Sequence, residues 1–453
     1  MTNGKRVEKY SIFILLLIRI VYVTTTVKIL DGLWYYGGGY GIHFSAAKEV
    51  VALLLFMLMA LYFRHNFYTN NFKTLVIKVL FTLYYVPLNA SFSIHDQPFS
   101  YFVLTNVYFF LLMFFCCKAI RLGPVKLSAS SERGFSQYDS STYEGRLDFL
   151  DKPAVRIVLF LICFLCIAYK ISYNGFSFAF NILSDSVYTT RETYVETMNA
   201  LDSSLLGYVA TLITNLAGYA VPFYLYLALK KKNILASIVS ILCLLSLFSI
   251  SSSKSAIIFI VIVFAIVFLE NRKRLEVFSR YFELAILVLL IASLVIYLIF
   301  NKYDFYFLIL RREMFLPSWL DTMYYELFGN GPKIWWSQGT FFLQRIIPSA
   351  YSEGYLQMIN NAYFGGYVPS PNTGLFADAF MNLGILGVVF YPLLISFVLN
   401  KSDGVYQKYG VGISTVMAAK LAIHFTNVPL LRTDFILSYF LFTFVLWFVS
   451  KVK

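Results

Sequence analysis

Long apolar runs recur along the whole sequence, and they constrain the fold more than any other feature. A helix needs about 20 predominantly apolar residues to cross a bilayer, and we count about twelve such runs by this criterion. Only 13% of the residues are charged, whereas soluble domains average about 25%. The charged side chains are therefore too few to cover a water-exposed surface. The sequence predicts an all-α polytopic membrane protein and excludes a soluble enzyme, a disulfide scaffold and a disordered chain.

Most of the predicted spans follow one another closely, and together they form one integral membrane domain over residues 1–453. Their approximate bounds are 11–30, 47–63, 74–92, 99–117, 154–171, 204–229, 233–250, 256–269, 282–300, 375–398, 411–427 and 435–450. The first run lacks a small-residue cleavage site, so we expect it to remain as a span.

The distribution of Lys and Arg predicts the orientation of the chain. With the N-terminus in the cytoplasm, the basic runs KKK (230–232) and NRKR (271–274) fall on the cytoplasmic side, as the positive-inside rule requires. Both termini are then cytoplasmic. The net charge of +13 is explained by this bias, so we expect no nucleic-acid partner.

Three of the segments between predicted spans are much longer than the others. Residues 118–153 are rich in Ser and charge and indicate a cytoplasmic linker. Residues 172–203 and 301–374 fall on the opposite side as two long periplasmic loops. The second is rich in Pro, Trp and Tyr, which predicts short helices on the outer membrane–water boundary.

Basic side chains on the predicted outer side are exceptions to the positive-inside rule. They are Arg191, Lys254, Arg311, Arg312, Arg345 and Arg432. Arginine binds phosphate in a bidentate manner and keeps its charge in a partly dry site. Two or three of these cations meeting in one pocket would hold a diphosphate leaving group without a metal. The alternative is that they bind lipid head groups or pair with the nearby acids Glu192, Glu313 and Asp434.

Ionisable groups within the predicted spans are scarce. Asp378 lies just inside the outer end of one span, where a carboxylate is costly unless it is paired or functional. His424 lies four residues after Lys420, so the two share a helical face; a hydrogen-bonded core histidine is the alternative. The sequence has no D-x-D and no H-E-x-x-H motif, so we predict no metal site and no metal-dependent transfer from a nucleotide sugar.

Four segments occur in an order that resembles the Wzy-type polymerases of O-antigen and related polysaccharides. They are VYTTRETYVETMNALDSSLLGYV (187–209), SSSKSA (251–256), LQRIIPSAYSEGY (343–355) and PSPNTGLFADAFMNLGILGVVFYP (369–392). The similarity covers roughly residues 187–395. It implies a GT-C-like bundle in the bacterial inner membrane, with two important periplasmic loops.

The resemblance also implies an activity and a set of roles. Such a polymerase transfers a growing chain from undecaprenyl diphosphate onto a new lipid-linked repeat unit at the periplasmic face. The candidates for the base that activates the acceptor hydroxyl are Glu353, Asp378 and His424. The candidates for stacking on sugar rings are Trp319, Trp335 and Trp336. Asn372 is expected to cap a helix or to bind sugar. The partners implied are membrane lipid and a separate chain-length regulator, and no cofactor is expected.

Two other functions remain open. The related O-antigen ligases often carry a histidine in the long outer loop, and residues 301–374 contain none, which favours the polymerase. A lipid-linked oligosaccharide flippase or another transporter would be expected to show matched halves and a midplane site, and no such repeat is visible in the sequence.

Overall fold

The chain forms helices throughout the part that the computed structural model describes. The described residues are 2–33, 39–67, 71–117, 153–174, 205–251, 254–308, 310–340, 343–366, 371, 374–449 and 451. The predicted loops 118–153 and 172–203 lie almost entirely outside them. The predicted loop 301–374 contains three described α-helices, α13 (Asp304–Leu308), α14 (Leu316–Gly329) and α15 (Tyr355–Phe364).

Eight helical segments of the described chain are long and apolar enough to cross a membrane. They are Ile12–Leu30, Ala46–Asn66, Phe72–Ile94, Phe99–Cys117, Val155–Ser172, Leu212–Lys230, Leu275–Phe300 and Ile385–Tyr409. Shorter apolar helices, Ile234–Ser249, Ala256–Asn271, Val411–Phe425 and Ile436–Phe448, coincide with the remaining predicted spans. The chain is therefore a multi-pass membrane protein whose described regular structure is entirely helical, and the total of twelve spans stays a prediction.

Contacts divide the chain into two compact units. Unit 1 comprises Met1–Lys126, Ser279–Asn400 and Ala422–Arg432, and unit 2 comprises Leu127–Phe278, Lys401–Leu421 and Thr433–Lys453.

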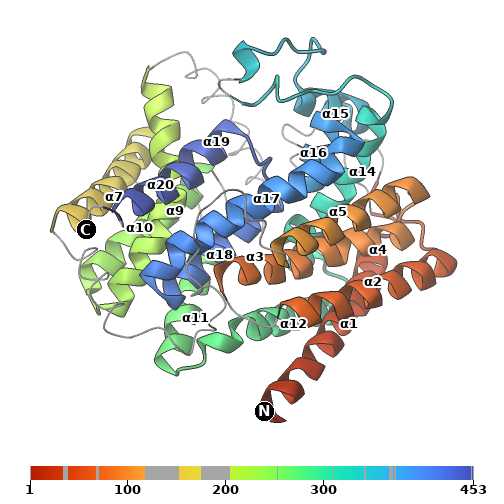
Figure 1. Cartoon of the computed structure of the whole chain (residues 1–453), viewed down its shortest axis with the longest axis horizontal. Helices are drawn as coiled ribbons and strands as arrows, with labels where there is room; N and C mark the ends of the chain where they lie inside the picture. Colours follow the sequence, from red (N-terminus) through yellow and green to blue (C-terminus); the bar gives the residue numbers. More distant parts are fainter. Residues whose placement is uncertain are drawn as a thin grey trace. The chain divides into compact units, whose positions relative to one another are not determined.

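Unit 1 is built around the buried helical run from Phe72 to Ile94. This run consists of α3 (Phe72–Leu80), a π-helical turn (Phe81–Tyr85) and α4 (Val86–Ile94). Helix α4 packs against α1 (Thr2–Leu30), α2 (Ala46–Asn66) and α5 (Phe99–Cys117) (Figure 1). Stacked rings support the π turn, with Phe81 4.4 Å from Phe63 and Tyr85 4.7 Å from Phe109 between ring centroids. Offset aromatic packing of this kind adds stability beyond the burial of area.

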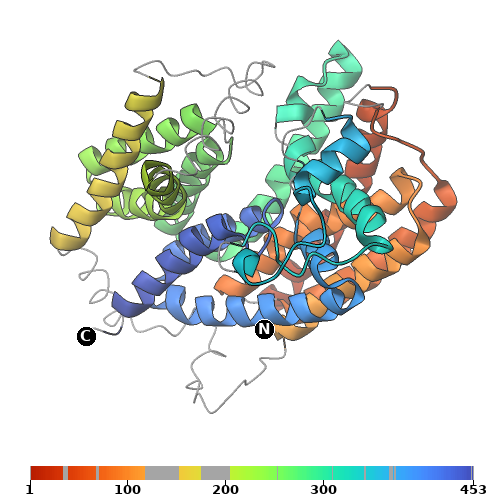
Figure 2. The ribbon, with the colours of Figure 1, turned by 90° about the horizontal axis from the view of Figure 1, so that it is seen from above.

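The later helices of unit 1 gather around α14. Helix α14 contacts α4, α15 and α16 (Leu375–Leu383) (Figures 1 and 2). Helix α12 (Phe278–Phe300) and most of α17 (Ile385–Tyr406) also belong to this unit.

The predicted span 375–398 is broken in the structure. Helix α16 ends at Leu383, and Gly384 has φ +61° and ψ −137°, a conformation that essentially only glycine adopts. Helix α17 then starts at Ile385. Expecting one continuous helix here was wrong, because the hydropathy pattern did not reveal this glycine-dependent break. As a consequence, Asp378 lies on a short helix outside the long apolar segments.

Unit 2 is a bundle around α9 (Leu205–Lys230), which packs against α7 (Pro153–Asn174), α10 (Ile234–Ser251) and α11 (Lys254–Asn271) (Figures 1 and 2). The unit also contains a short π segment (Ile436–Phe440) and α20 (Leu441–Val449), both in contact with α9. Serines within α10 bond the carbonyl four residues earlier, as Ser240 does to Ala236 at 2.7 Å. Polar side chains in these apolar helices therefore satisfy themselves locally.

Candidate functional site

A cavity of about 320 Å³ in unit 1 is the candidate site. It is lined by Ser337, Gln338, Gly339, Gln344, Gly354, Tyr355, Leu356 and Arg432. The lining thus combines one guanidinium group with amides, a hydroxyl and a phenol ring. Such a surface suits a polar ligand with many hydrogen-bonding groups and a negative charge.

A second, narrow cavity of about 10 Å³ shares part of this lining. Gln338, Gly339, Tyr355 and Arg432 contribute to both. The small cavity also borders Asp378, Asn382 and Trp336, together with Thr340, Met381, Pro429 and Leu431. The buried Asp378 carboxyl group therefore borders the narrow cavity, four of whose lining residues also line the larger one.

Gln338 holds two segments of the cavity wall together. Its side-chain oxygen accepts a hydrogen bond from the Tyr355 backbone N–H at 2.6 Å, at the start of α15. Its amide nitrogen donates to the Ser349 hydroxyl at 2.8 Å and to the Glu353 carbonyl at 3.0 Å. One glutamine thus satisfies the turn that begins α15 and joins two segments that line the cavity.

Trp335 and Trp336 adopt an unusual backbone conformation beside the cavity. Both have positive φ, +53° and +57°, in a region that bulky residues rarely occupy. The Trp336 backbone N–H donates to the Asn382 side-chain oxygen at 2.7 Å, and its indole N–H donates to the Tyr391 hydroxyl at 2.6 Å. The Trp336 and Tyr391 rings are also stacked, 6.0 Å apart. These contacts hold a strained turn against α16 and α17.

Asp378 is buried, with 1% of its surface exposed, and its carboxyl group accepts hydrogen bonds from neutral donors. The Leu430 backbone N–H donates to one oxygen at 2.7 Å, and the Asn382 amide donates to the other at 2.8 Å. Burial raises the pKa of the Asp378 carboxyl to about 7, although these hydrogen bonds and the Tyr391 hydroxyl act to lower it. A carboxyl group with this pKa can take up and release a proton near neutral pH.

The predicted phosphate-binding cations occupy different places. Arg432 lines both cavities. Arg345 is exposed on a short 3₁₀ helix (Leu343–Arg345) next to the lining residue Gln344. Arg311 is buried, with its guanidinium 4.5 Å from the Phe307 ring centroid. Arg311 and Arg312 lie on a π-helical turn (Arg311–Phe315), and neither lines the cavities.

Three further predicted residues fall outside what the structure describes. Arg191 and Asn372 lie outside the described residues, and so does the side chain of Lys254. Their proposed roles stay predictions.

The other predicted catalytic residues do not line the cavities. Glu353 is exposed; its carboxylate accepts a hydrogen bond from the Asn361 amide at 3.2 Å, while its backbone precedes the lining residue Gly354. His424 is half-buried in the last turn of α18 (Val411–Phe425).

The three tryptophans predicted to bind sugar differ in exposure. Trp336 is half-buried and borders the narrow cavity, and Trp335 is 48% exposed. Trp319 is buried in an aromatic cluster with Phe315 and Phe364, whose ring centroids lie 5.8 Å and 5.7 Å away.

Sequence reasoning missed the amides and phenols of the site. Gln338 lies outside the four segments that carry the resemblance. Tyr355, Asn382 and Tyr391 lie inside two of those segments, but the resemblance implied no role for them. A further signal was the spacing of Asp378 and Asn382, which are four residues apart and therefore share a helical face.

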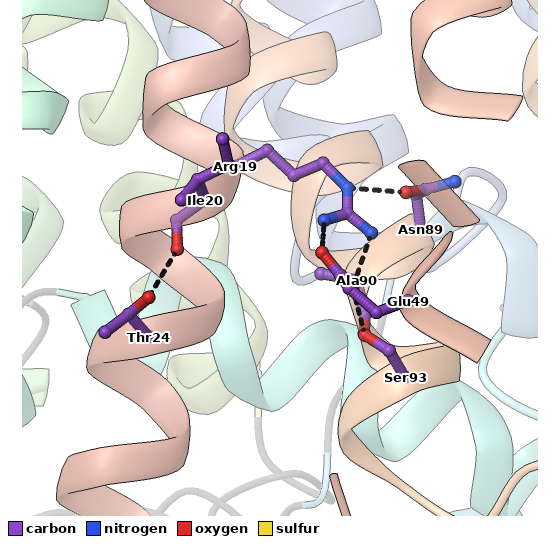
Figure 3. Close-up of polar contacts among 7 residues, drawn as sticks. All are labelled: Arg19, Ile20, Thr24, Glu49, Asn89, Ala90 and Ser93. Atoms are coloured by element: carbon purple, nitrogen blue, oxygen red, sulfur yellow. Dashed lines mark hydrogen bonds and ion pairs between the residues drawn. The ribbon is translucent and has the colours of Figure 1, made fainter. Parts of the chain in front are cut away.

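Sequence reasoning also missed a buried ion pair among the first helices of unit 1 (Figure 3). Arg19 of α1 is fully buried and pairs with Glu49 of α2, with a second contact between Nη2 and Oε2 of 3.1 Å. The Arg19 Nε–H donates to the Asn89 amide oxygen at 2.9 Å, and the Ser93 hydroxyl donates to Glu49 at 2.6 Å. A charge in the middle of an apolar run requires such a partner, so Arg19 itself was the missed signal.

Comparison with known proteins gives no relative: no family model, curated protein or solved structure matches the chain.

Proposed function

We propose that unit 1 holds the transfer site of a metal-independent glycosyltransferase. It polymerises undecaprenyl-diphosphate-linked oligosaccharide repeat units into O-antigen or a related surface polysaccharide, at the periplasmic face of the bacterial inner membrane. The observation that carries the proposal is the pairing of the buried Asp378 carboxyl with a cavity lined by Arg432, amides and an aromatic ring. Sugar hydroxyls match the amides, and a diphosphate matches the guanidinium.

The proposed reaction joins two lipid-linked sugars. The acceptor hydroxyl loses its proton to the Asp378 carboxylate, and its oxygen forms a bond with the anomeric carbon of the donor. The bond between that carbon and the diphosphate oxygen breaks, and undecaprenyl diphosphate leaves with the bonding electrons. The raised pKa of Asp378 makes it a stronger base than an ordinary carboxylate, while it remains largely ionised slightly above neutral pH.

Arg432 is the proposed contact to the leaving diphosphate. A bidentate guanidinium–phosphate contact strengthens as negative charge develops on the leaving group. Arg191, Lys254 and Arg345 remain the further cations proposed for this role, and Trp335 and Trp336 remain the proposed sugar-stacking rings.

Deletion of the gene in a strain that displays the polysaccharide tests the proposal. Loss of a polymerase leaves lipopolysaccharide with a single repeat unit on the core, which electrophoresis separates from the long-chain ladder. Loss of a ligase or flippase leaves the core without any repeat unit, and that pattern would contradict the proposal.

Complementation with site variants then tests the cavity. We expect Asp378→Asn to lower polymer formation by about 10²–10⁴-fold, the usual contribution of a general base. Asp321→Asn is the matched control, because Asp321 is also fully buried in unit 1 but does not line the cavities. With equal protein abundance, a full ladder from Asp378→Asn would exclude Asp378 as the base.

A further inference from the structure

We propose that Asn382 is a positioning residue that aims the Asp378 carboxyl and ties it to the wall of the cavity. This inference rests on the proposed function for its consequence in catalysis. The position of the Asn382 side chain depends only on its hydrogen bonds, and the titration of Asp378 tests it independently of polymer formation.

Asn382 bonds two parts of the site at once. It is buried, with 2% of its surface exposed. Its amide nitrogen donates to the Asp378 carboxyl at 2.8 Å and to the Asp378 backbone carbonyl at 2.8 Å. Its amide oxygen accepts the backbone N–H of Trp336 at 2.7 Å.

The Trp336 contact fixes which end of the amide faces the carboxyl group. A backbone N–H must meet the amide oxygen, so the amide nitrogen is left to face Asp378. The reverse orientation would place an oxygen against the carboxylate and a nitrogen against the N–H group, which is unfavourable on both sides. The strained turn at Trp335 and Trp336 therefore keeps a donor directed at Asp378.

Other titratable groups near Asp378 also influence its pKa. The titratable side chains near Asp378 or on the elements packed against α16 include Tyr84, Tyr101, Tyr108, Asp321, Tyr324, Tyr325, Glu326, Lys333, Tyr355, Tyr391 and Arg432. Among the side-chain donors, Asn382 and Tyr391 form hydrogen bonds to the carboxyl group. Asn382 also bonds the turn beside the cavity.

The direction in which the Asp378 pKa should change follows from the role of Asn382 as a hydrogen-bond donor. A hydrogen bond to the charged form of a carboxyl favours that form and lowers its pKa. Loss of the Asn382 donor is therefore expected to raise the Asp378 pKa above its present value of about 7. A base that is protonated over a wider pH range works only at higher pH. The acid limb of the pH–activity profile should therefore move to higher pH.

Infrared titration of the purified full-length protein tests the positioning role directly. The protonated carboxyl band of Asp378 is assigned by its loss in Asp378→Asn. In Asn382→Leu we expect the midpoint of this band to rise by about one pH unit, a tenfold change in proton affinity. Polymer formation should show a lower kcat with little change in KM, and its acid limb should move upward by the same amount.

Asn106→Leu is the matched control. Asn106 is buried in α5 of the same unit, donates to the carbonyl four residues earlier at 2.7 Å and accepts from the Tyr85 hydroxyl at 2.8 Å. Its loss is expected to lower stability to a similar extent but to leave the Asp378 titration unchanged. Equal titration curves in Asn382→Leu and wild type would overturn the positioning role.

Asn382→Asp provides a second test if Asn382→Leu fails to fold. This variant keeps the shape and the acceptor for Trp336, but it replaces the donor by a second carboxyl group. Two carboxyl groups in contact titrate with one pKa raised, so the midpoint should rise further; an unchanged midpoint overturns the inference. Suppose the Asn382 variants shift the Asp378 titration but Asp378→Asn still forms full-length polymer. The positioning role of Asn382 would then stand, and the proposed function would be contradicted.

Discussion

Two polar clusters in the described part of unit 1 balance charge in opposite ways. The cluster around Arg19 places a guanidinium against the Glu49 carboxylate among apolar helices (Figure 3). The cluster around Asp378 instead surrounds a carboxyl group with neutral donors, the Asn382 amide and the Leu430 backbone N–H.

This difference in charge balance distinguishes the Arg19 cluster, which is structural, from the Asp378 cluster, which can take part in chemistry. In the ion pair, each charge compensates the other, and the pair joins α1 to α2. A carboxyl group held by neutral donors keeps a pKa near neutrality and borders a cavity, so it can gain and lose a proton.

The largest effect is expected from Arg19→Ala. Removing Arg19 leaves the Glu49 carboxylate uncompensated; breaking a fully buried pair costs about 3–5 kcal/mol, and this is the upper limit here because the Glu49 side chain is 18% exposed. We expect most of the purified protein to be lost or to unfold at a much lower temperature, as measured by fluorescence-detected size exclusion during heating. The double variant Arg19→Met with Glu49→Leu removes both charges and should recover most of the loss.

The exposed pair of Lys48 and Asp96 is the control for this prediction. Its nitrogen and oxygen lie 3.0 Å apart, but the Asp96 side chain is 88% exposed. Lys48→Ala should therefore change stability by less than about 1 kcal/mol. Equal losses from Lys48→Ala and Arg19→Ala would show that the burial of the Arg19 pair is unimportant.

Asp378 should make stability depend on pH. Its pKa is raised by burial from 3.8 to about 7, so the folded protein holds a proton that the unfolded chain releases between these values. Asp378 therefore stabilises the fold fully below about pH 4, and that contribution is lost as the pH rises to about 7, by at most about 4 kcal/mol. Thermal unfolding between pH 4 and 8 measures this slope, and Asp378→Asn should flatten it; equal slopes would contradict the raised pKa.

The fold class was within reach of the sequence because apolar runs report directly on bilayer-spanning helices. Seven of the predicted spans correspond to long apolar helices of the described chain, and the eighth long helix, Ile385–Tyr409, covers only part of the predicted span 375–398. The break at Gly384 was not within reach, because α16 and α17 are both apolar and the signal is a backbone angle.

The candidate site was predicted only in part, for a physical reason. Asp378 and Arg432 are conspicuous because charges near apolar segments need an explanation. The cavity wall depends on Gln338 and Asn382, whose roles come from hydrogen bonds between segments far apart in sequence. Trp319 illustrates the same difficulty, since its residue type indicates stacking but its partners are core rings.

Gly384→Ala is expected to lower thermal stability by an intermediate amount, because Gly384 follows α16, the helix that carries Asp378. A Cβ atom at this position would lie 2.9 Å from Cε of Lys333, and φ is +61°. Strain of this kind costs about 1–3 kcal/mol, and the end of α16 should shift. Thermal unfolding checks the loss, with Gly404→Ala as the control, because nothing lies within 4 Å of a Cβ there and alanine favours the helix.

Glu353→Gln should have the smallest effect, and it tests which carboxylate is the base. Glu353 is exposed, and its contact with the cavity wall is made by its backbone carbonyl, which accepts from Gln338 at 3.0 Å. Glutamine keeps that backbone contact and retains an oxygen for the Asn361 amide, so stability should change by no more than about 0.5 kcal/mol. We expect the polysaccharide ladder on a gel to remain within twofold of wild type. A loss as large as that expected for Asp378→Asn would move the base from the buried carboxyl to the exposed one, and the contrast between the two clusters would then no longer explain the chemistry.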